Sequence, residues 1–345
     1  MRIVLGIESS CDETAAALVA SDRRILAQAI ASQDDRHAPY GGVVPEIAAR
    51  AHAERLTPLV QRVLDEAQMA LSDVDAVAAT AGPGLIGGVM VGLVTAKALA
   101  MASDRPLLAI NHLEGHALSP RLADAELAFP YALLLVSGGH CQVLRVEGVG
   151  RYRRFATTID DALGDAFDKT AKILGLGFPG GPAVERLAAS GDPRAVPLPR
   201  PLAGTDEPHF SFAGLKSAVL RANDSGRYAA ADIAASFQQA AIDCILDRTS
   251  RALEAMDDIS ALVVAGGVAA NARVRAALEG LAADRGLRFV APPQALCTDN
   301  AAMIAWAGLE RVAAGLPADP LDIAARPRWP LDPEAEAVRG AGVKA

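Results

Sequence analysis

One local pattern occurs twice along this chain: an apolar strand, a short polar or glycine-rich loop, and a second apolar strand. In residues 3–20 the loop is Ser9–Thr14, and in residues 131–146 it is Ser137–His140. Further apolar runs alternate with helical periodicity along the rest of the chain. Alternation of this kind predicts an α/β protein. Because both halves open in the same way, we expect an internally duplicated fold with two lobes and a cleft between them.

Helical periodicity marks the long segments between the strands. These segments are Pro45–Gln68, Gly88–Met101, Ala162–Leu174, Ala229–Met256, Asn271–Arg285 and Asp299–Ala314. A length of 345 residues suffices for about two domains, each with its own core. We expect an N-terminal lobe over residues 1–117, completed by a C-terminal helix at 300–325, a C-terminal lobe over residues 118–299, and an extended tail over residues 326–345.

The chain carries 33 basic and 41 acidic residues, a formal net charge of −8. This balance excludes a protein that coats nucleic acid or anionic membranes through net charge alone, although it is compatible with a local basic patch. Acidic residues at Glu8 and Asp12 interrupt the N-terminus too early for a signal peptide. The cysteines lie far apart and form no C-x-x-C pair, which favours a reduced, cytoplasmic setting; they are Cys11, Cys141, Cys244 and Cys297.

One uncharged stretch, Ala76–Ala96, has nearly the length of a membrane span. Gly82-Pro83-Gly84 breaks it close to its start. We therefore interpret it as a strand, a turn and a buried helix, and we expect no association with a membrane.

Two histidines follow the apolar run at residues 107–110. On a helix, their spacing places His112 and His116 on one face, as metal ligands require, though a surface or capping pair has the same spacing. Asp299, before an apolar helix, is a third candidate ligand or else an ordinary helix cap. Two imidazoles and one carboxylate leave coordination positions open and suit Fe(II) or Zn(II).

A metallopeptidase is an alternative explanation for such a histidine pair. Its H-E-x-x-H motif requires glutamate directly after the first histidine. Leu113 occupies that position, and Glu114 points away from the pair on the helix. The sequence therefore disfavours a peptidase.

Three glycine loops precede helices, at residues 82–88, 180–182 and 266–271. Glycine lets a ligand approach the backbone, and helix N-termini bind phosphate or carboxylate groups. None of the loops has the phosphate-loop motif G-x-x-x-x-G-K-[ST], so each by itself is compatible with a plain turn. Their repetition favours a nucleotide cleft.

Four charged residues in small or apolar surroundings are further candidates. Asp168 lies inside a helix and suits a ligand hydroxyl, whereas Asp160, Asp161 and Asp165 suit a solvated helix start. Lys216 stands beside two phenylalanines and is compatible with an ordinary surface lysine. Asp12 and Glu13, after the first strand, are either turn residues or residues that line the cleft.

Seven short motifs occur in order along nearly the full chain. They are G-I-E-S-S-C-D-E-T at residues 6–14, H-L-E-G-H at 112–116, V-S-G-G-H at 136–140, G-F-P-G-G-P at 177–182, F-S-F-A-G-L-K at 210–216, A-G-G-V-A-A-N at 265–271 and C-T-D-N-A-A-M at 297–303. Together they resemble the tRNA N6-adenosine threonylcarbamoyltransferase family. The number and order of the motifs make this resemblance highly specific.

The resemblance implies the fold of actin, Hsp70 and the sugar kinases (the ASKHA fold), in which two similar α/β lobes flank a nucleotide cleft. It implies transfer of the threonylcarbamoyl group from threonylcarbamoyl-adenylate to N6 of the adenosine 3′ of the anticodon, in tRNAs that read codons beginning with adenine, with release of AMP. A kinase or ATPase of the same fold, or a non-catalytic scaffold, is the alternative from another class. The kinase would need no iron, and the scaffold would lack the three candidate ligands.

By position in the motifs, the resemblance implies one divalent metal, usually iron, held by His112, His116 and Asp299. It implies that Asp12, Glu13 and Lys216 assist the acceptor amine or the phosphate. Glu185 stands where the family commonly has aspartate and is one methylene longer. The implied substrate-binding residues are Leu135, Val136, Ser137, Gly138, Gly139, Asp168, Gly181, Glu185 and Asn271.

The resemblance also implies partners. These are tRNA, threonylcarbamoyl-adenylate, a non-catalytic paralogue that pairs with the N-terminal lobe, and a small P-loop ATPase. The apolar helices at residues 45–68 and 88–101 are candidate partner surfaces. Because the chain is acidic, tRNA binding requires either electrostatics from a partner or a local basic surface, for which the candidates are Arg151, Arg153, Arg154, Arg194 and Arg200.

Overall fold

The computed structural model describes residues 1–40, 42–177, 179–336 and 338. The chain divides into two compact units. The expected boundary at residue 117 falls inside a helix, residues 112–123, that belongs wholly to the first unit. Of the expected tail, Ala337 and residues 339–345 lie outside the described residues. The first unit contains Met1–Glu126, Val149–Arg151 and Thr298–Pro333, and the second contains Leu127–Gly148, Tyr152–Cys297 and Glu334–Ala345.

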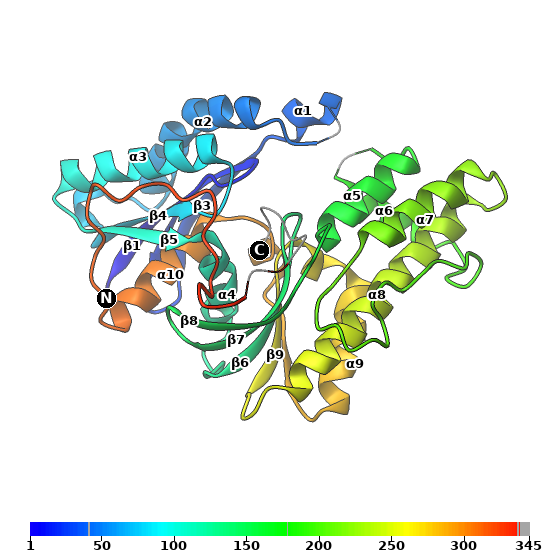
Figure 1. The fold of residues 1–345 in the computed structure, drawn as a ribbon. Helices are drawn as coiled ribbons and strands as arrows, with labels where there is room; N and C mark the ends of the chain where they lie inside the picture. Colours follow the sequence, from blue (N-terminus) through cyan, green and yellow to red (C-terminus); the bar gives the residue numbers. More distant parts are fainter. Residues whose placement is uncertain (41, 178, 337, 339–345) are drawn as a thin grey trace. The chain divides into compact units, whose positions relative to one another are not determined.

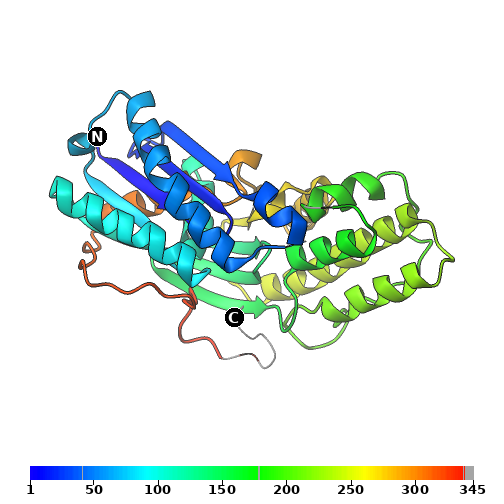
Figure 2. The same ribbon diagram turned by 90° about the horizontal axis from the view of Figure 1, so that it is seen from above.

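The first unit is built on a five-stranded sheet in the order β3-β2-β1-β4-β5. Strand β1 pairs antiparallel with β2 and parallel with β4, and β4 pairs parallel with β5. Helices α2 and α3 lie side by side over one face of the sheet, and α10 packs against β1 and β2 from the other (Figures 1 and 2). The elements are β1 (Ile3–Glu8), β2 (Glu13–Ala20), β3 (Ile25–Ser32), α1 (Asp34–His37), α2 (Pro45–Glu66), β4 (Ala76–Gly82), α3 (Ile86–Ser103), β5 (Leu107–Asn111), α4 (His112–Ala123) and α10 (Ala301–Ala313).

The second unit contains another five-stranded sheet, in the order β10-β9-β6-β7-β8. Helices α5 to α8 pack on one another, and α9 packs against β9, β10 and α8. The elements are β6 (Tyr131–Val136), β7 (Cys141–Gly148), β8 (Arg151–Thr157), α5 (Leu163–Ile173), α6 (Gly180–Ala188), α7 (Ala213–Asp224), α8 (Ala230–Glu254), β9 (Ala261–Ala265), α9 (Ala272–Asp284) and β10 (Arg288–Val290).

The two sheets have the same topology. Strand β6 pairs antiparallel with β7 and parallel with β9, as β1 does with β2 and β4. Read from β8, the second sheet has the order β8-β7-β6-β9-β10, which matches β3-β2-β1-β4-β5 position by position. The internal duplication predicted from the repeated strand–loop–strand pattern is therefore confirmed.

The helices expected from periodicity agree with the structure to within two residues at each end, but the C-terminal helix expected at residues 300–325 ends at Ala313, because Gly315 adopts a positive φ and Pro317 follows. Strands β3, β8, β9 and β10 and the short helices α1, α6 and α7 were not predicted. Strand β8 contains three arginines and lies at the edge of its sheet. Charged residues are common on edge strands, where they discourage pairing with other chains, and they hide the strand from an analysis of apolar runs.

The uncharged stretch at residues 76–96 is divided between β4 and α3, with a turn at Gly82–Pro83 between them. The predicted strand and turn are confirmed, and strand β4 lies inside the sheet between β1 and β5. Helix α3 is long and apolar enough to cross a membrane by length and composition, but 33% of that window is buried within the protein. Its packing against β4 explains the buried face only, because Ile86, Met90, Val94 and Met101 are exposed. The expectation of a buried helix is therefore wrong for the other face.

Glycine at position 6 allows α10 to lie directly on β1. A Cβ atom at Gly6 would lie 2.3 Å from the Ala301 carbonyl oxygen and 2.7 Å from the Ala305 nitrogen. Both atoms belong to the backbone of the first turns of α10, so neither can move without the helix. This close approach brings the start of α10, and Asp299 before it, to the carboxyl end of β1.

We predict that Gly6→Ala lowers the stability of the protein by about 1 to 3 kcal/mol, because the added methyl group overpacks this contact. Gly280→Ala is the matched control, since Gly280 lies in α9 with nothing within 4 Å of its Cβ position. Thermal unfolding followed by circular dichroism should give a lower midpoint for the first variant and an unchanged or higher midpoint for the second. Equal midpoints would contradict this account of the contact.

Candidate metal centre

Helix α4 positions both histidines in its first two turns. The helix begins at His112 because Asn111 caps it: the Asn111 Oδ1 accepts a hydrogen bond of 2.9 Å from the Leu113 N–H. The imidazole rings of His112 and His116 lie on one face with their centroids 4.7 Å apart, and both residues are buried. The sequence prediction that the two rings share a helical face is confirmed.

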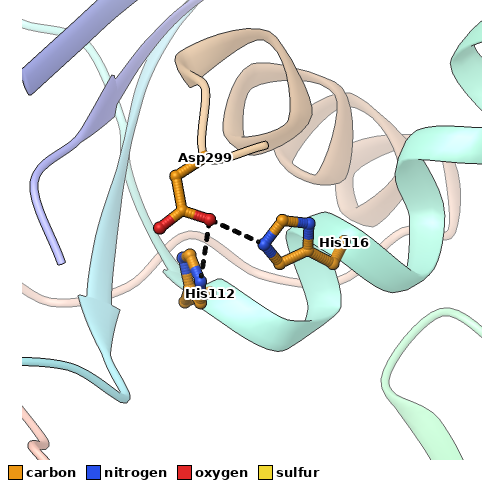
Figure 3. Close-up of side chains that lie close together, drawn as sticks. All are labelled: His112, His116 and Asp299. Carbon is orange, nitrogen blue, oxygen red and sulfur yellow. Dashed lines mark hydrogen bonds and ion pairs between the residues drawn. The ribbon is translucent and has the colours of Figure 1, made fainter. Parts of the chain in front are cut away.

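Asp299 joins the two histidines from the N-terminal end of α10. Asn300 caps that helix by accepting a 2.9 Å hydrogen bond from the Met303 N–H, and Asp299 directly precedes it. The Asp299 Oδ1 lies 2.9 Å from the His116 Nε2 and 3.6 Å from the His112 Nε2, as Figure 3 shows. One ligand atom from each side chain lies within 4.8 Å of the others.

A buried glutamate, Glu8, orients the first histidine. The Glu8 Oε2 lies 3.0 Å from the His112 Nδ1 and accepts a hydrogen bond from the Thr80 hydroxyl, while its Oε1 accepts one from the Ser10 N–H. With its Nδ1 engaged in this way, His112 presents Nε2 to Asp299. Glu8 was not among the site residues expected from the sequence, where the available signal was a carboxylate as the last residue of an apolar strand.

Electrostatic interactions within this cluster shift the pKa values of its members. Burial alone would lower the pKa of His112, but the nearby carboxylates of Asp299 and Glu8 raise it to about 9. Burial alone would raise the pKa of Glu8, but the charge of His112 and its hydrogen bond lower it. Without a metal, His112 therefore carries a proton at neutral pH.

The donor set fits a divalent transition metal. Two imidazole nitrogens and one carboxylate form a three-ligand set that leaves positions open for substrate. A metal-bound histidine usually donates its other ring N–H to a carboxylate, and Glu8 has this relation to His112. The His116 Nδ1 is buried without a hydrogen-bond partner in the described part of the chain, so the interaction at Nε2 orients this ring.

Glu114 does not take part in the ligand set. Its Oε1 accepts a 3.0 Å hydrogen bond from the Gly150 N–H, so this carboxylate serves the local structure. Leu113 follows His112 directly, so the helix does not carry the H-E-x-x-H motif.

Of the three residues predicted to assist the reaction, two lie in the first unit. Asp12 is in the loop between β1 and β2, and Glu13 begins β2. Burial and the negative charges of Asp299 and Asp12 raise the pKa of Glu13 well above its usual value. Glu13 is thus within electrostatic range of Asp299.

The third of these residues, Lys216, lies on α7 in the second unit. Its Nζ is 2.6 Å from the Asp161 Oδ2, and Lys169 contacts the same carboxylate. Burial alone would raise the pKa of Asp161, but its hydrogen bonds with Lys216 and Lys169 lower it. Lys216 is therefore partly buried and held in an ion pair, which the sequence did not predict.

The remaining predicted substrate residues lie at the carboxyl ends of parallel strands of the second sheet and on the helices that follow. Leu135 and Val136 end β6, and Ser137, Gly138 and Gly139 form the loop to β7. Side-chain space at Gly138 and Gly139 is open, with nothing within 4 Å of either Cβ position. A Cβ atom at Gly266, after β9, would lie 2.4 Å from the Val136 carbonyl oxygen, so these two loops touch.

Hydrogen bonds connect the helices that carry the other predicted residues. The Asp168 Oδ1 accepts a bond of 2.9 Å from the Gly180 N–H, next to Gly181. The Glu185 Oε1 accepts one of 2.8 Å from the Ala272 N–H, and the Asn271 Nδ2 donates one of 3.0 Å to Gln238. Glu185 and Gln238 line a pocket of about 320 Å³ together with Arg273.

Comparisons with known proteins agree with the motifs. The family model described as tRNA N6-adenosine threonylcarbamoyltransferase matches residues 24–306. Curated relatives with this name from Erythrobacter litoralis and Sphingopyxis alaskensis are 77% and 73% identical over 345 residues, which is all of both chains in each case.

Two solved structures show the fold alone. The chain is similar to (R)-2-hydroxyglutaryl-CoA dehydratase component A of Acidaminococcus fermentans, with a TM-score of 0.55 and 18% identity over 91% of this chain and 100% of that one. It is also similar to HypF of T. kodakarensis, with a TM-score of 0.62 and 14% identity over 91% of this chain and 48% of that one. The fold is the duplicated two-lobe type of actin, Hsp70 and the sugar kinases.

The raised pKa of His112 predicts that metal affinity depends on pH. A metal must displace the proton of His112, so the apparent affinity for Co²⁺ should rise by about tenfold per pH unit from neutral pH and level off near pH 9. Glu8→Gln removes one of the two carboxylates that raise this pKa, so its plateau should begin at lower pH. Its plateau affinity should be about 10- to 100-fold weaker, because His112 loses its orienting partner.

Optical titration with Co²⁺ between pH 6 and 10 measures both effects. Glu54→Gln is the matched control, since Glu54 is exposed on α2 and pairs with Arg36. A pH-independent affinity, or a Glu8→Gln profile identical to that of the control, would contradict the assignment.

Proposed function

Because the chain belongs to the tRNA N6-adenosine threonylcarbamoyltransferase family, and so transfers a threonylcarbamoyl group from threonylcarbamoyl-adenylate to tRNA with release of AMP, we propose that His112, His116 and Asp299 form its metal site. The observation that carries the proposal is the convergence of three ligand atoms within 4.8 Å, with Glu8 orienting one of them. Two histidines and one carboxylate with open positions are typical of non-haem Fe(II), which we propose as the metal. Zn(II) fits the same donors, and metal analysis of the purified protein decides between the two.

When bound, the metal supplies Lewis-acid polarisation of the carbamoyl carbonyl. The N6 amine of the adenosine attacks the carbonyl carbon, a C–N bond forms, and the bond to the phosphate oxygen of AMP breaks. We assign Glu13, with Asp12 beside it, to receive the proton that the amine loses. The support is that burial and the negative charges of Asp299 and Asp12 raise the pKa of Glu13, which makes its carboxylate a stronger base.

The second unit is proposed to bind the adenylate. Backbone amides of Ser137–Gly139 suit its phosphate or carboxylate, and the open space at the two glycines permits close approach. Glu185 lines a pocket wide enough for part of a nucleotide, and Asn271 is bonded to Gln238 of the same pocket. Asp168 and Gly181 complete the proposed contacts to the adenosine, and Lys216 is assigned to the phosphate.

A partner subunit is proposed to cover helix α3. Four large apolar side chains on this helix are more than two-fifths exposed. Their spacing places three of them on one stripe, as in a helix-to-helix interface. The stripe consists of Ile86, Met90 and Val94, and Met101 is exposed farther along the helix. We assign the stripe as the surface that binds the non-catalytic paralogue. The small P-loop ATPase is proposed to join the same assembly.

Two further assignments concern location and tRNA. The four cysteines are all free thiols, which supports a cytoplasmic location.

For tRNA, a pocket of about 600 Å³ in the second unit is lined by three arginines and one acidic residue. Arg200 pairs with that residue, Asp243, so Arg194 and Arg273 supply the excess positive charge. We propose that this pocket contacts tRNA phosphates, while the β8 arginines remain further candidates.

His116→Ala should reduce threonylcarbamoyl transfer by about 100-fold or more, because it removes a ligand and with it the polarisation of the carbonyl. The assay combines unmodified tRNA, synthetic threonylcarbamoyl-adenylate and the partner proteins, with nucleoside mass spectrometry as the readout. His209→Gln is the control, since His209 lies in the second unit and bonds only to backbone and Glu207 among the described contacts. Full activity of His116→Ala in a correctly folded, metal-free state would refute the metal assignment.

Arg194→Gln should weaken tRNA binding uniformly across tRNA species and reduce the slope of log affinity against log salt by about 1, because one phosphate contact is lost. Arg24→Gln, an exposed arginine paired with Asp22, is the control and should keep the wild-type slope. Binding is measured by fluorescence anisotropy over a series of salt concentrations. If Arg153→Gln on β8 changes the slope and Arg194→Gln does not, the tRNA surface is at β8 instead.

A further inference from the structure

The chain after α10 returns along the first unit and covers the edge of its sheet (Figure 1, orange to red). The Asp319 N–H donates to the Leu107 carbonyl oxygen at 2.9 Å, and the Asp319 Oδ2 accepts from the Ala109 N–H at 2.8 Å. Strand β5 is the edge strand, so these bonds satisfy groups that would otherwise face solvent. Covering an edge is sufficient to explain this part of the segment.

The following residues, Arg326–Trp329, make contacts of another kind. The Arg326 N–H donates to the Ala81 carbonyl oxygen at 2.7 Å, and the Pro327 carbonyl oxygen accepts from the Gly84 N–H at 3.3 Å. A Cβ atom at Gly82 would lie 1.8 Å from the Arg326 carbonyl oxygen, so the segment and the loop after β4 are in direct backbone contact. We call residues 326–329 the strap.

The strap reaches the metal helix through Asn111. The Asn111 Nδ2 donates a 2.8 Å hydrogen bond to the Trp329 carbonyl oxygen, while its Oδ1 caps α4 at the Leu113 N–H. Asn111 is 4% exposed, so this amide has both ends engaged in the interior. Its side chain therefore connects the strap to the first turn of the helix that carries His112.

The strap reaches the same histidine by a second route, through the loop after β4. Gly84 is held by Pro327, and the neighbouring Leu85 N–H donates to the Ser10 carbonyl oxygen at 2.7 Å. The Ser10 hydroxyl lies 3.2 Å from the His112 Nδ1. The helix start at Asn111 thus contacts the strap directly, and Ser10, one of the Nδ1 partners of His112, is linked to the strap through Gly84 and Leu85.

We propose that the strap positions the metal helix, with Asn111 as a positioning residue that fixes the start of α4 and the orientation of His112. The predicted effect on metal affinity rests on the proposed metal site. The positioning of the first turn of α4 by the strap does not, because it is a property of the metal-free protein. It predicts that weakening the strap loosens the first turn of α4 and lowers metal affinity, whereas mere edge covering predicts a change of overall stability alone.

Asn111→Ser is the direct test, because serine still caps the helix and cannot reach Trp329. Hydrogen exchange of the metal-free protein should show the first turn of α4 exchanging about fivefold faster, the loss expected from one hydrogen bond. The dissociation constant for Co²⁺ should rise about tenfold. Asn271→Ser is the matched control for both measurements, since Asn271 also caps a helix with Oδ1 and donates from Nδ2.

Arg326→Pro tests the second route in the full-length chain. It removes the N–H that binds Ala81, and the following Pro327 already restricts residue 326 to extended backbone. Arg326→Ala is its control, because it removes the guanidinium over the Trp329 ring but keeps the N–H. Arg326→Pro should weaken Co²⁺ binding about tenfold relative to Arg326→Ala.

The outcomes separate this inference from the proposed function. Wild-type exchange in α4 and wild-type Co²⁺ affinity in both Asn111→Ser and Arg326→Pro would overturn the strap and leave the metal site standing. If His112→Ala binds Co²⁺ as the wild type does, the metal assignment fails, and faster exchange in Asn111→Ser would still support the strap. If the variants lower the unfolding midpoint but change neither the hydrogen exchange of α4 nor the Co²⁺ affinity, the strap only covers the edge of the sheet and does not position α4.

Discussion

A hydrogen bond between two buried side chains, Glu8 and His112, determines the geometry of the candidate metal centre. Neither group could be buried in its charged form alone, and removing one member of such a pair typically costs about 3 to 5 kcal/mol. The pair forms because β1 and β5 run parallel, with β4 between them, so that their carboxyl ends meet at one edge. Thr80, at the end of β4, donates to the same carboxylate from between them. The sheet therefore places the histidine, its orienting carboxylate and the helix start together.

The third ligand depends on a different constraint, the close packing of α10 on β1. Asp299 and His116 are 183 positions apart in the sequence but 2.9 Å apart in space. Gly6 makes this possible, since any side chain there would displace the first turn of α10. The strap then returns over the same edge and contacts the helix start from outside. A strand, a helix from the other end of the chain and an irregular segment thus all converge on α4.

The duplicated topology divides the chemistry between two units. In both sheets the functional loops follow the carboxyl ends of parallel strands, which is where open α/β sheets bind ligands. The first unit places acidic and imidazole side chains there, which suits a metal. The second places glycine loops and backbone amides there, together with Glu185 and Asn271 beside a pocket, which suits a nucleotide. The same frame thus carries two different candidate sites because the loop sequences differ.

Periodicity and motif order were enough to predict the duplicated α/β fold, the main helices and the grouping of His112, His116 and Asp299, because apolar spacing and short motifs are local properties of a chain. Edge strand β8 was missed because its arginines mask the apolar pattern. The ion pair of Lys216 was not predicted because its partner, Asp161, is 55 positions away. Glu8 and Asn111 look like an ordinary strand end and helix cap in the sequence. Only the tertiary structure brings β1, β5 and residues 326–329 together. Because these contacts are long-range, no local pattern could reveal that Glu8 orients His112 or that Trp329 binds the residue that caps α4.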